Sequence, residues 1–249
     1  MDIPQLKETL SDINRMGYIV SLRKGNTGIG YTLETLLGVA ENNLRSPDLE
    51  NIELRETSLG VAEDNLRYSD SGNIELKSRR IKSTSLLTMF TFNYSIWKIE
   101  QEELIQQYGY YKDGRWALYT TVKNKPNNRG FYVKIEQDYV RLYHEDGLCA
   151  IEWKLEGLID DLKSKFSNVL LVEAESRKSG GQEEFWYKEA HLLTGIIVEK
   201  FLEYIKNGTI AIDLRMHINK NGAVRNHGTG FRLHRRYLNS CFNNTERLL

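Results

Sequence analysis

Asp70, Glu75 and Lys77 are the side chains of this chain whose types and spacing best suit metal-assisted chemistry. They lie in the stretch Asp-Ser-Gly-Asn-Ile-Glu-Leu-Lys, which has the alternation of a β-strand. On a strand, Glu75 and Lys77 point to the same face because side chains alternate with a period of two residues. Two carboxylates can hold Mg²⁺, which prefers oxygen ligands and acidifies a bound water, while an ammonium group orients that water or offsets developing charge. The spacing therefore predicts a metal site, held by Asp70 and Glu75, for hydrolysis of a phosphodiester assisted by Lys77.

The same spacing also has a simpler interpretation, a half-exposed strand with solvated charges. Charged residues make up 27% of the chain, so patterns of this kind arise by chance. The flanking segments favour the metal site. A glycine-rich segment at 24–34 precedes the motif, and Ser-Leu-Leu-Thr-Met-Phe follows it at 85–90. The glycine-rich segment predicts either a tight turn or a loop that cradles a phosphate at the start of a helix.

This order of motifs resembles the MvaI/BcnI family of type II restriction endonucleases, which share the PD-(D/E)xK nuclease fold and are similar to the MutH mismatch-repair nickase. The resemblance implies an α/β fold, a restriction-endonuclease-like mixed sheet flanked by helices, with two lobes around a DNA cleft. It implies a single endonuclease unit over residues 1–249, with a catalytic lobe centred on 20–95 and recognition segments centred on 208–236. Residues 95–165 match the family only in outline.

A tandem duplication lies within the motif region. Residues 34–55 and 56–77 align without a gap, and 15 of the 22 positions are identical. One pair of repeats does not make a solenoid, which needs at least three stacked units. In the family, an acidic residue on the helix before the motif supports the site. Glu56 keeps the family's distance to Asp70, whereas Glu34 keeps the glycine-rich segment, so both remain candidates.

The two copies differ at positions where chemistry would be affected. The first copy keeps the family's Pro-Asp pair at Pro47 and Asp48, but it ends in Arg55. The second copy has Ser69 in place of the proline and ends in Lys77. A lysine is a compact charge that can lie close to an attacking water, and a planar guanidinium does not replace it neutrally. We therefore expect the second copy to supply the catalytic strand.

A second group of candidate residues lies near the C-terminal end of the sequence. Asp213 and Arg215 fall in the segment Ile-Asp-Leu-Arg-Met, and His227 and Arg232 fall in Asn-His-Gly-Thr-Gly-Phe-Arg-Leu. Both segments resemble the base-reading segments of MvaI-type enzymes. Each arginine can donate two hydrogen bonds to guanine, Asp213 can accept from cytosine or brace an arginine, and His227 can do either. The alternative is an internal ion pair between Asp213 and Arg215, with His227 structuring a turn.

The net charge of the chain is zero, so any nucleic-acid site must be local. Basic residues cluster at 77–82 and 225–236, and a solvated face is the alternative interpretation of each cluster. The residues expected to contact the DNA backbone are Lys24, Arg79, Arg80 and Thr229.

The resemblance implies Mg²⁺-dependent cleavage of double-stranded DNA at a short GC-containing site, leaving 5′-phosphate and 3′-hydroxyl ends. It is compatible with action as a monomer, and a cytosine methyltransferase encoded nearby would be a functional partner. The alternatives are a MutH-like nickase and a catalytically impaired sequence-specific DNA-binding protein. The N-terminus lacks the features of a signal peptide and no apolar run is long enough to span a membrane, so we expect a cytoplasmic protein.

Periodicity and turn residues also predict the main elements. Helices are expected at 3–16, from about 32, at 95–107, 155–166 and 196–207. Strands are expected at 116–123, 131–137, 139–144, 168–175 and 212–216, and residues 226–233 are expected to form a turn that leads into another strand.

Overall fold

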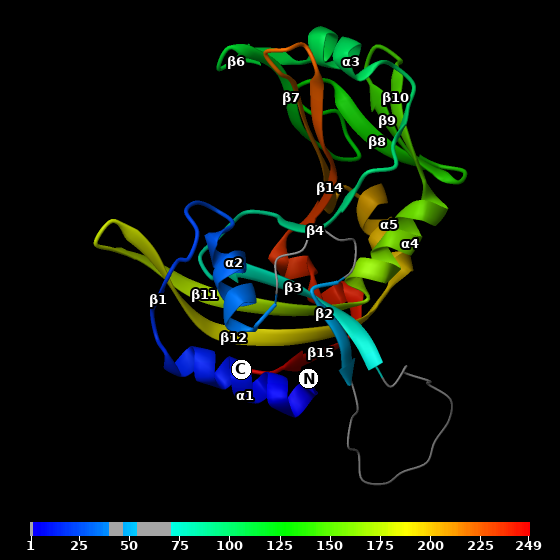
Figure 1. The fold of residues 1–249 in the computed structure, drawn as a ribbon. Coiled ribbons are helices and arrows are strands. Elements are labelled where there is room, and N and C mark those ends of the chain that lie inside the picture. The colour runs from blue at the N-terminus through cyan, green and yellow to red at the C-terminus, as the bar shows by residue number, and fades with distance from the viewer. Residues whose placement is uncertain (1, 40–46, 54–70) are drawn as a thin grey trace, which may run out of the picture. The chain divides into compact units, whose positions relative to one another are not determined.

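The computed structural model describes residues 2–39, 47–53 and 71–249 (Figure 1). They form two compact units that alternate along the sequence. The first unit comprises Met1–Thr84, Ser164–Ile196 and Phe242–Leu249. The second comprises Ser85–Lys163 and Ile197–Cys241. Each unit has its own sheets and its own apolar core.

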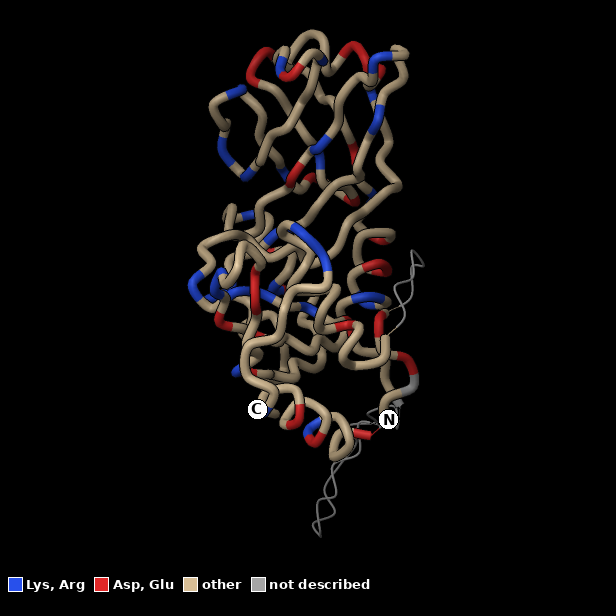
Figure 2. Tube along the Cα trace, turned by 60° about the vertical axis from the view of Figure 1, so that its left-hand side comes forward, with Lys and Arg blue, Asp and Glu red and all other residues tan. Residues whose placement is uncertain are grey.

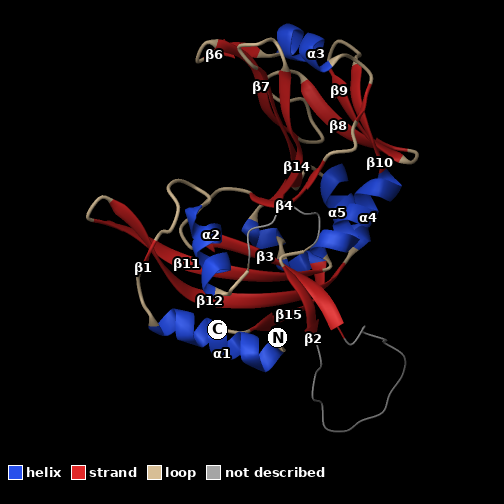
Figure 3. Ribbon diagram, viewed as in Figure 1, coloured by secondary structure: helices blue, strands red, loops and turns tan. Residues whose placement is uncertain are grey.

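The first unit is built on a mixed sheet (Figure 3). Its elements are α1 (Ile3–Arg15), β1 (Ile19–Val20), α2 (Gly28–Leu36), β2 (Leu49–Glu53), β3 (Ser71–Arg80), β11 (Asn168–Ser179), β12 (Gln182–Ile196) and β15 (Phe242–Arg247). The strand order is β1-β12-β11-β3-β2, and β15 also pairs with β12. The β3–β11 pair is parallel, and the other pairs of this sheet are antiparallel.

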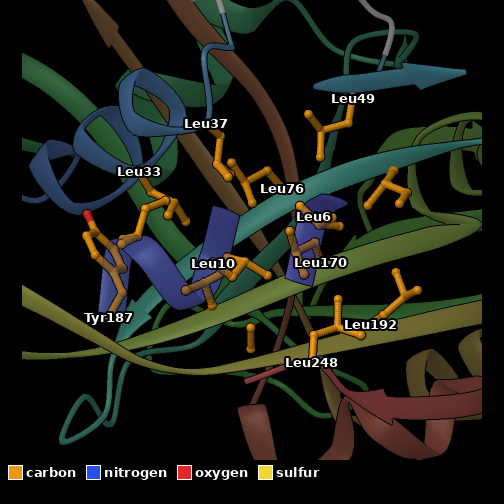
Figure 4. Packing of buried hydrophobic residues seen from close by; sticks show 14 of the residues in the cluster. Leu6, Leu10, Leu33, Leu37, Leu49, Leu76, Leu170, Tyr187, Leu192 and Leu248 are labelled. Carbon is orange, nitrogen blue, oxygen red and sulfur yellow. The ribbon is translucent and has the colours of Figure 1, made fainter. Parts of the chain in front are cut away.

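Two helices cover one face of this sheet and bury its apolar side chains. In α1, Leu6, Leu10 and Ile13 recur at helical spacing and are buried, as the sequence predicts. The helix begins with a capping box in which Asp2 and Gln5 each satisfy a backbone N–H of the other. Figure 4 shows these leucines meeting Leu33 and Leu37 of α2 above the strands. The core therefore fixes how α1 and α2 lie on β3 and β11.

The register of β3 follows from this burial. Ile74 and Leu76 are buried in the cluster under α1 and α2. Because strand side chains alternate, Glu75 and Lys77 project from the other face of the strand. Within the sheet, β11 is the parallel neighbour of β3, and Val169 is paired with Glu75.

The second unit contains two antiparallel sheets, ordered β5-β10-β9-β8 and β4-β14-β13-β7-β6. Its elements are β4 (Leu87–Phe92), β5 (Ile96–Trp97), α3 (Gln101–Tyr108), β6 (Tyr110–Lys112), β7 (Arg115–Val122), β8 (Phe131–Glu136), β9 (Tyr139–His144), β10 (Cys149–Lys154), α5 (Val198–Lys206), β13 (Ile210–Ile218), β14 (Val224–Leu233), η1 (Arg235–Tyr237) and η2 (Asn239–Cys241). Helix α4 (Leu155–Phe166) begins in this unit and ends in the first. The core of the second unit includes the stacked rings of Phe90 and Phe231, and the Phe201 ring of α5 contacts both.

These features confirm the predicted fold class, an α/β chain with sheets flanked by helices. Residues 95–107 were expected to form one helix, which is wrong in its first half. Ile96 and Trp97 instead form β5, paired to Glu152 and Ile151, and α3 starts at Gln101. The pairing with β10 provides backbone partners that local helical periodicity does not reveal.

Acidic and basic residues are interspersed along the trace in Figure 2, consistent with the net charge of zero. None of the helices in the described residues is both long enough and apolar enough to cross a membrane.

Candidate functional site

Glu75 and Lys77 meet as the sequence predicts. Lys77 Nζ donates to Glu75 Oε1 at 2.6 Å, and both side chains are largely buried, with 20% and 17% of Lys77 and Glu75 exposed. Apolar neighbours surround them on this face of β3. Leu171 of β11 pairs with Lys77, and the Phe166 ring centroid lies 6.0 Å from Lys77 Nζ. The ion pair therefore lies in a partly dry environment, where its charges interact more strongly than in water.

The carboxyl group of Glu75 has an unusual electrostatic environment. Burial raises its pKa above the ordinary value, the Lys77 charge opposes this effect, and the negative charge of Asp48 adds to it. A carboxylate that is both desolvated and close to a second carboxylate is strained in its ionised form. A divalent cation would relieve that strain, so the donor set suits a hard metal ion.

Asp48, from the first copy of the duplication, lies at the edge of the same strand. Antiparallel pairing of β2 with β3 sets Leu49 opposite Ile74, and Leu76 N–H donates to Asp48 Oδ2 at 2.8 Å. The carboxylate is thus held at the backbone between Glu75 and Lys77. The sequence alone did not select Asp48, although its Pro-Asp pair was the available signal.

Asp70 and Glu56, the second-copy candidates, lie outside the described residues. Glu34, the alternative helix acid, is on α2 and lines a pocket of about 330 Å³ together with Lys77 and Ser78. A Cβ placed at Gly30 would lie 3.5 Å from both Glu34 Oε1 and Ser78 Oγ. Gly30 of α2 therefore lies close to both Glu34 and Ser78, at a distance that an ordinary side-chain contact allows.

The glycine-rich segment forms the loop that leads into α2, with the helix starting at Gly28 rather than near Thr32. A Cβ at Gly28 would collide with the backbone oxygen of Arg23 and the hydroxyl of Ser21, so only glycine fits this junction. Lys24 is exposed in the loop, as a phosphate contact requires. Arg23, Thr27 and Tyr31 line the same pocket as Glu34, and the Arg23 guanidinium lies 3.9 Å from the centre of the Tyr31 ring.

Arg79 and Arg80, both expected at the DNA backbone, have acidic partners within the first unit. Arg79 Nε lies 3.7 Å from Glu173 Oε1, and its guanidinium also donates to the backbone oxygen of Ser83. Arg80 makes two hydrogen bonds to Glu183, at 2.7 and 2.8 Å. These pairs reduce the positive charge that either arginine presents to a polyanion.

A group of potential metal ligands lies on β11 and β12. Glu173, Glu189 and His191 each offer a ligand atom, and these atoms all lie within 4.8 Å of one another. Carboxylate and imidazole donors can hold a divalent ion. Arg79 lies beside Glu173, which offsets part of the negative charge of the group.

In the second unit, all four predicted base-reading residues line one pocket of about 250 Å³. Asp213, Arg215, His227 and Arg232 are joined there by Thr88 and Thr91 of β4. The two threonines were not predicted, although they belong to the strand that follows the catalytic motif in sequence. The pocket wall is thus made from three adjacent strands, β4, β14 and β13.

Asp213 braces both arginines. Its Oδ2 accepts from Arg215 at 2.9 Å and from Arg232 at 2.5 Å, and its Oδ1 accepts from the Thr121 hydroxyl. Burial alone would raise the pKa of Asp213, but the hydrogen bonds from Thr121, Arg215 and Arg232 hold it below its ordinary value. The carboxylate is therefore ionised at neutral pH. The ion pair between Asp213 and Arg215, the alternative to base reading in the sequence analysis, is present. The same carboxylate also orients Arg232.

The two arginines differ in exposure. Arg215 has 45% of its side chain exposed, whereas Arg232 has 24% and also donates to the backbone oxygen of Leu86. Arg215 Nε and one terminal nitrogen both face Asp213, which fixes the plane of its guanidinium. That arrangement leaves the outer edge of Arg215 directed to solvent.

His227 is exposed beside a glycine that its strand requires. Gly228 has φ +79, and a Cβ there would collide with the side chains of Thr91 in β4 and of Asn93 just after that strand. Thr229, expected at the DNA backbone, is 2% exposed, and its hydroxyl lies 3.5 Å from Ser95 Oγ. Its side chain therefore faces the interior of the second unit.

A polar network next to Arg215 was not predicted from the sequence. His217 is buried, with Nδ1 3.0 Å from the Tyr119 hydroxyl and Nε2 3.1 Å from Asn219 Oδ1. Burial lowers the pKa of His217, and the nearby Arg115 charge lowers it further. A neutral His217 thus holds Tyr119, whose ring lies 5.8 Å from the Arg215 guanidinium carbon.

One family model matches nearly the whole chain. The family model described as the MvaI/BcnI restriction endonuclease family matches residues 7–57, which contain the first copy, and 54–242, which contain the second. No match was found among curated proteins.

Two solved structures are similar over nearly the whole chain. A restriction endonuclease MvaI–cognate DNA substrate complex has a TM-score of 0.77 and 26% identity, covering 99% of this chain and 98% of that one. Restriction endonuclease MvaI in the absence of DNA has a TM-score of 0.52 and 25% identity, covering 98% and 96%. This chain belongs to the MvaI/BcnI restriction endonuclease family, whose members are type II site-specific deoxyribonucleases.

Proposed function

We propose that this enzyme hydrolyses phosphodiester bonds of double-stranded DNA at a short GC-containing site, with Mg²⁺ as its cofactor. The observation that carries the proposal is the Glu75–Lys77 pair, 2.6 Å apart on one face of β3, with the Asp48 carboxylate at the edge of the same strand. An acid–x–lysine pair held in a partly dry environment beside a second carboxylate suits hydrolysis of a phosphodiester.

Each side chain has a separate task in this chemistry. Glu75 supplies a carboxylate oxygen to the metal ion, which when bound polarises a phosphoryl oxygen and acidifies a water molecule. Lys77 holds the attacking water or offsets charge on the phosphorane. Its ammonium group is positioned for this next to the proposed metal ligand, 2.6 Å from the Glu75 carboxylate. Phe166 and Leu171 keep bulk water from one side of this pair.

The pocket of the second unit supports recognition of guanine. A guanidinium whose plane is fixed by Asp213 can present two parallel N–H donors to guanine O6 and N7 in the major groove. Asp213 Oδ2 accepts from both arginines and Oδ1 accepts from Thr121, so we assign Asp213 an orienting role. Arg215, being more exposed than Arg232, is the principal reader.

Double-stranded DNA is the proposed partner, and the enzyme is proposed to act as a monomer. The similar MvaI structure with a TM-score of 0.77 is a complex with its cognate DNA substrate, which supports this choice of partner. A cognate methyltransferase of the same restriction system is the expected functional partner.

Incubation of the purified protein with plasmid DNA and Mg²⁺, followed by gel electrophoresis, tests the proposed function. We expect discrete fragments whose ends map to one short sequence containing G·C pairs. The matched control is Lys77→Ala, which should yield uncut plasmid under the same conditions.

Other products would contradict the proposal in distinct ways. Open circles without linear fragments would indicate nicking of one strand. A mobility shift without cutting at any Mg²⁺ concentration would indicate a binding protein. Cutting that persists in EDTA would contradict the assigned cofactor.

A further inference from the structure

The two copies of the duplication have lost complementary features. The first copy keeps Pro47 and Asp48, but it ends in Arg55 where the catalytic lysine would stand. The second copy ends in Lys77, but it has Ser69 before Asp70. Neither copy alone therefore has both intact halves of the motif.

The structure brings the intact halves together. Strand β2 belongs to the first copy, and residues 71–77 of β3 belong to the second. Their antiparallel register sets Leu49 opposite Ile74 and places Asp48 against Leu76 N–H at 2.8 Å. The partner of Ser71 in this register is Glu53, at the other end of β2 from Asp48. The start of β3 thus lies away from the point where Asp48 meets the strand.

Ser71, at the start of β3, is also far from Glu75 along the strand. A strand rises about 3.3 Å per residue, so four residues of β3 span roughly 13 Å. Carboxylates that share one Mg²⁺ must each reach it at about 2.1 Å. Asp48 approaches from the neighbouring strand, and the hydrogen bond from Leu76 N–H holds its carboxylate at the backbone next to Glu75.

Glu34, also from the first copy, is the third acid of the proposed site after Asp48 and Glu75. It lies on α2 and lines one pocket together with Lys77 and Ser78 of β3. Asp48 accepts from the N–H of Leu76, the residue between Glu75 and Lys77 on β3, so the first-copy carboxylate is anchored next to both second-copy side chains.

We propose that the active site is a composite of the two copies, with Glu34 and Asp48 supplied by the first and Glu75 and Lys77 by the second. This inference rests on the proposed function and identifies which duplicated acids hold its metal ion. The two departures from the family pattern, Arg55 and Ser69, then both fall in halves that the site does not use.

Matched isosteric variants test the composite site. Asp48→Asn and Asp70→Asn remove the same charge from the two copies, and Glu34→Gln and Glu56→Gln do the same for the helix acid. DNA cleavage is measured with Mg²⁺, and metal binding is measured without DNA by titrating the protein with Mn²⁺ and following free Mn²⁺ by electron paramagnetic resonance. Thermal unfolding of each variant confirms that it is folded.

We expect Asp48→Asn to lower the cleavage rate at least about 100-fold and to weaken Mn²⁺ binding by roughly tenfold or more. Asp70→Asn should match the wild type in both measurements. Glu34→Gln should slow cleavage more than Glu56→Gln does.

The composite site is wrong if Asp70→Asn loses as much cleavage and Mn²⁺ binding as Asp48→Asn, or if Asp48→Asn loses neither. A larger loss from Glu56→Gln than from Glu34→Gln overturns the assignment of the helix acid. A wild-type protein that cuts no DNA contradicts the proposed function instead. In that case the Mn²⁺ titrations of the Asp48 and Asp70 variants still decide which copy binds the metal.

Discussion

Lys77 depends on its neighbours for its position and for its effect. Glu75 Oε1 accepts a hydrogen bond from Lys77 Nζ at 2.6 Å, and the Phe166 ring lies beside the Lys77 ammonium group. In such a setting a compact ammonium ion stabilises developing negative charge more than the same ion does in water. An arginine at this position would be larger and planar, and it would not reach the same point.

We predict that Lys77→Ala lowers the cleavage rate by about 100- to 1,000-fold, because it removes one charge aimed at the reacting phosphate. Arg55→Ala is the matched change at the equivalent position of the first copy, and it should change the rate far less. Single-turnover cleavage of a cognate duplex measures both. Equal losses would show that the two copies share the chemistry.

The arginines of the second unit are best separated by their exposure. We predict that Arg215→Ala weakens binding to the cognate duplex by about 1–3 kcal/mol, with little change on non-specific DNA, because a bidentate arginine distinguishes guanine from other bases. Binding is measured in the Lys77→Ala background, which prevents cutting. Arg232→Ala is a less clean test because Arg232 also holds Asp213 and the Leu86 backbone.

Lys24→Ala is the phosphate-contact control for this measurement. It should weaken binding to every duplex and reduce the slope of log K against log salt by about one ion. If Arg215→Ala gave the same uniform loss with a shallower slope, it would be a backbone contact and its assigned role in base reading would be wrong.

At the scale of elements, the loop before α2 determines where that helix meets β3. Gly28→Ala places a methyl group against Arg23 and Ser21, and overpacking of this kind costs about 1–3 kcal/mol. Gly30→Ala, two residues later in the same helix, meets its neighbours only at 3.5 Å and should gain roughly 0.5–1 kcal/mol of helix stability. Urea unfolding of the two variants should therefore give changes of opposite sign. No loss of stability from Gly28→Ala would mean that the junction tolerates a side chain, and equal destabilisation would mean that Gly30 is as restricted as Gly28.

Strands β13 and β14 are linked by the ion pairs of Asp213. Because the folded-state pKa of Asp213 lies below its unfolded value of 3.8, its contribution to stability is complete above pH 3.8 and is lost as the pH falls through the folded pKa. We predict that Asp213→Asn lowers the free energy of unfolding by roughly 3 kcal/mol at pH 7. The difference from the wild type should shrink below pH 3.8, as urea titrations at several pH values would measure. A difference that stays constant with pH would contradict the role of the charge.

The sequence predicts local elements better than it predicts partners. Helix α1 and the shared face of Glu75 and Lys77 follow from periodicity, which acts within one element. The pairing of β2 with β3 does not, because β2 and the start of β3 are the equivalent segments of the two copies, and neither segment alone indicates that it pairs with the other. The bracing of Arg232 by Asp213 joins residues 19 positions apart across two strands, and nothing in either segment alone specifies that contact.

At the scale of the molecule, the two units are interleaved along the sequence. The chain passes from the first unit to the second after Thr84, returns at Ser164, leaves again after Ile196 and returns at Phe242. The Glu75–Lys77 pair belongs to the first unit, and the pocket around Asp213 belongs to the second. The proposed cutting chemistry and the proposed base reading therefore belong to different units.

A ribosome that makes this chain completes most of the recognition unit before the catalytic sheet can close. β3 pairs with β11, whose partner residues begin at Val169, and β12 later receives β15, which begins at Phe242. At synthesis rates of about 5–20 residues per second, the strand that carries Glu75 waits on the order of 5–20 s for its neighbour. During that interval the Glu75–Lys77 pair lacks Leu171 and Phe166, so its partly dry environment forms only after this later part of the chain has been made.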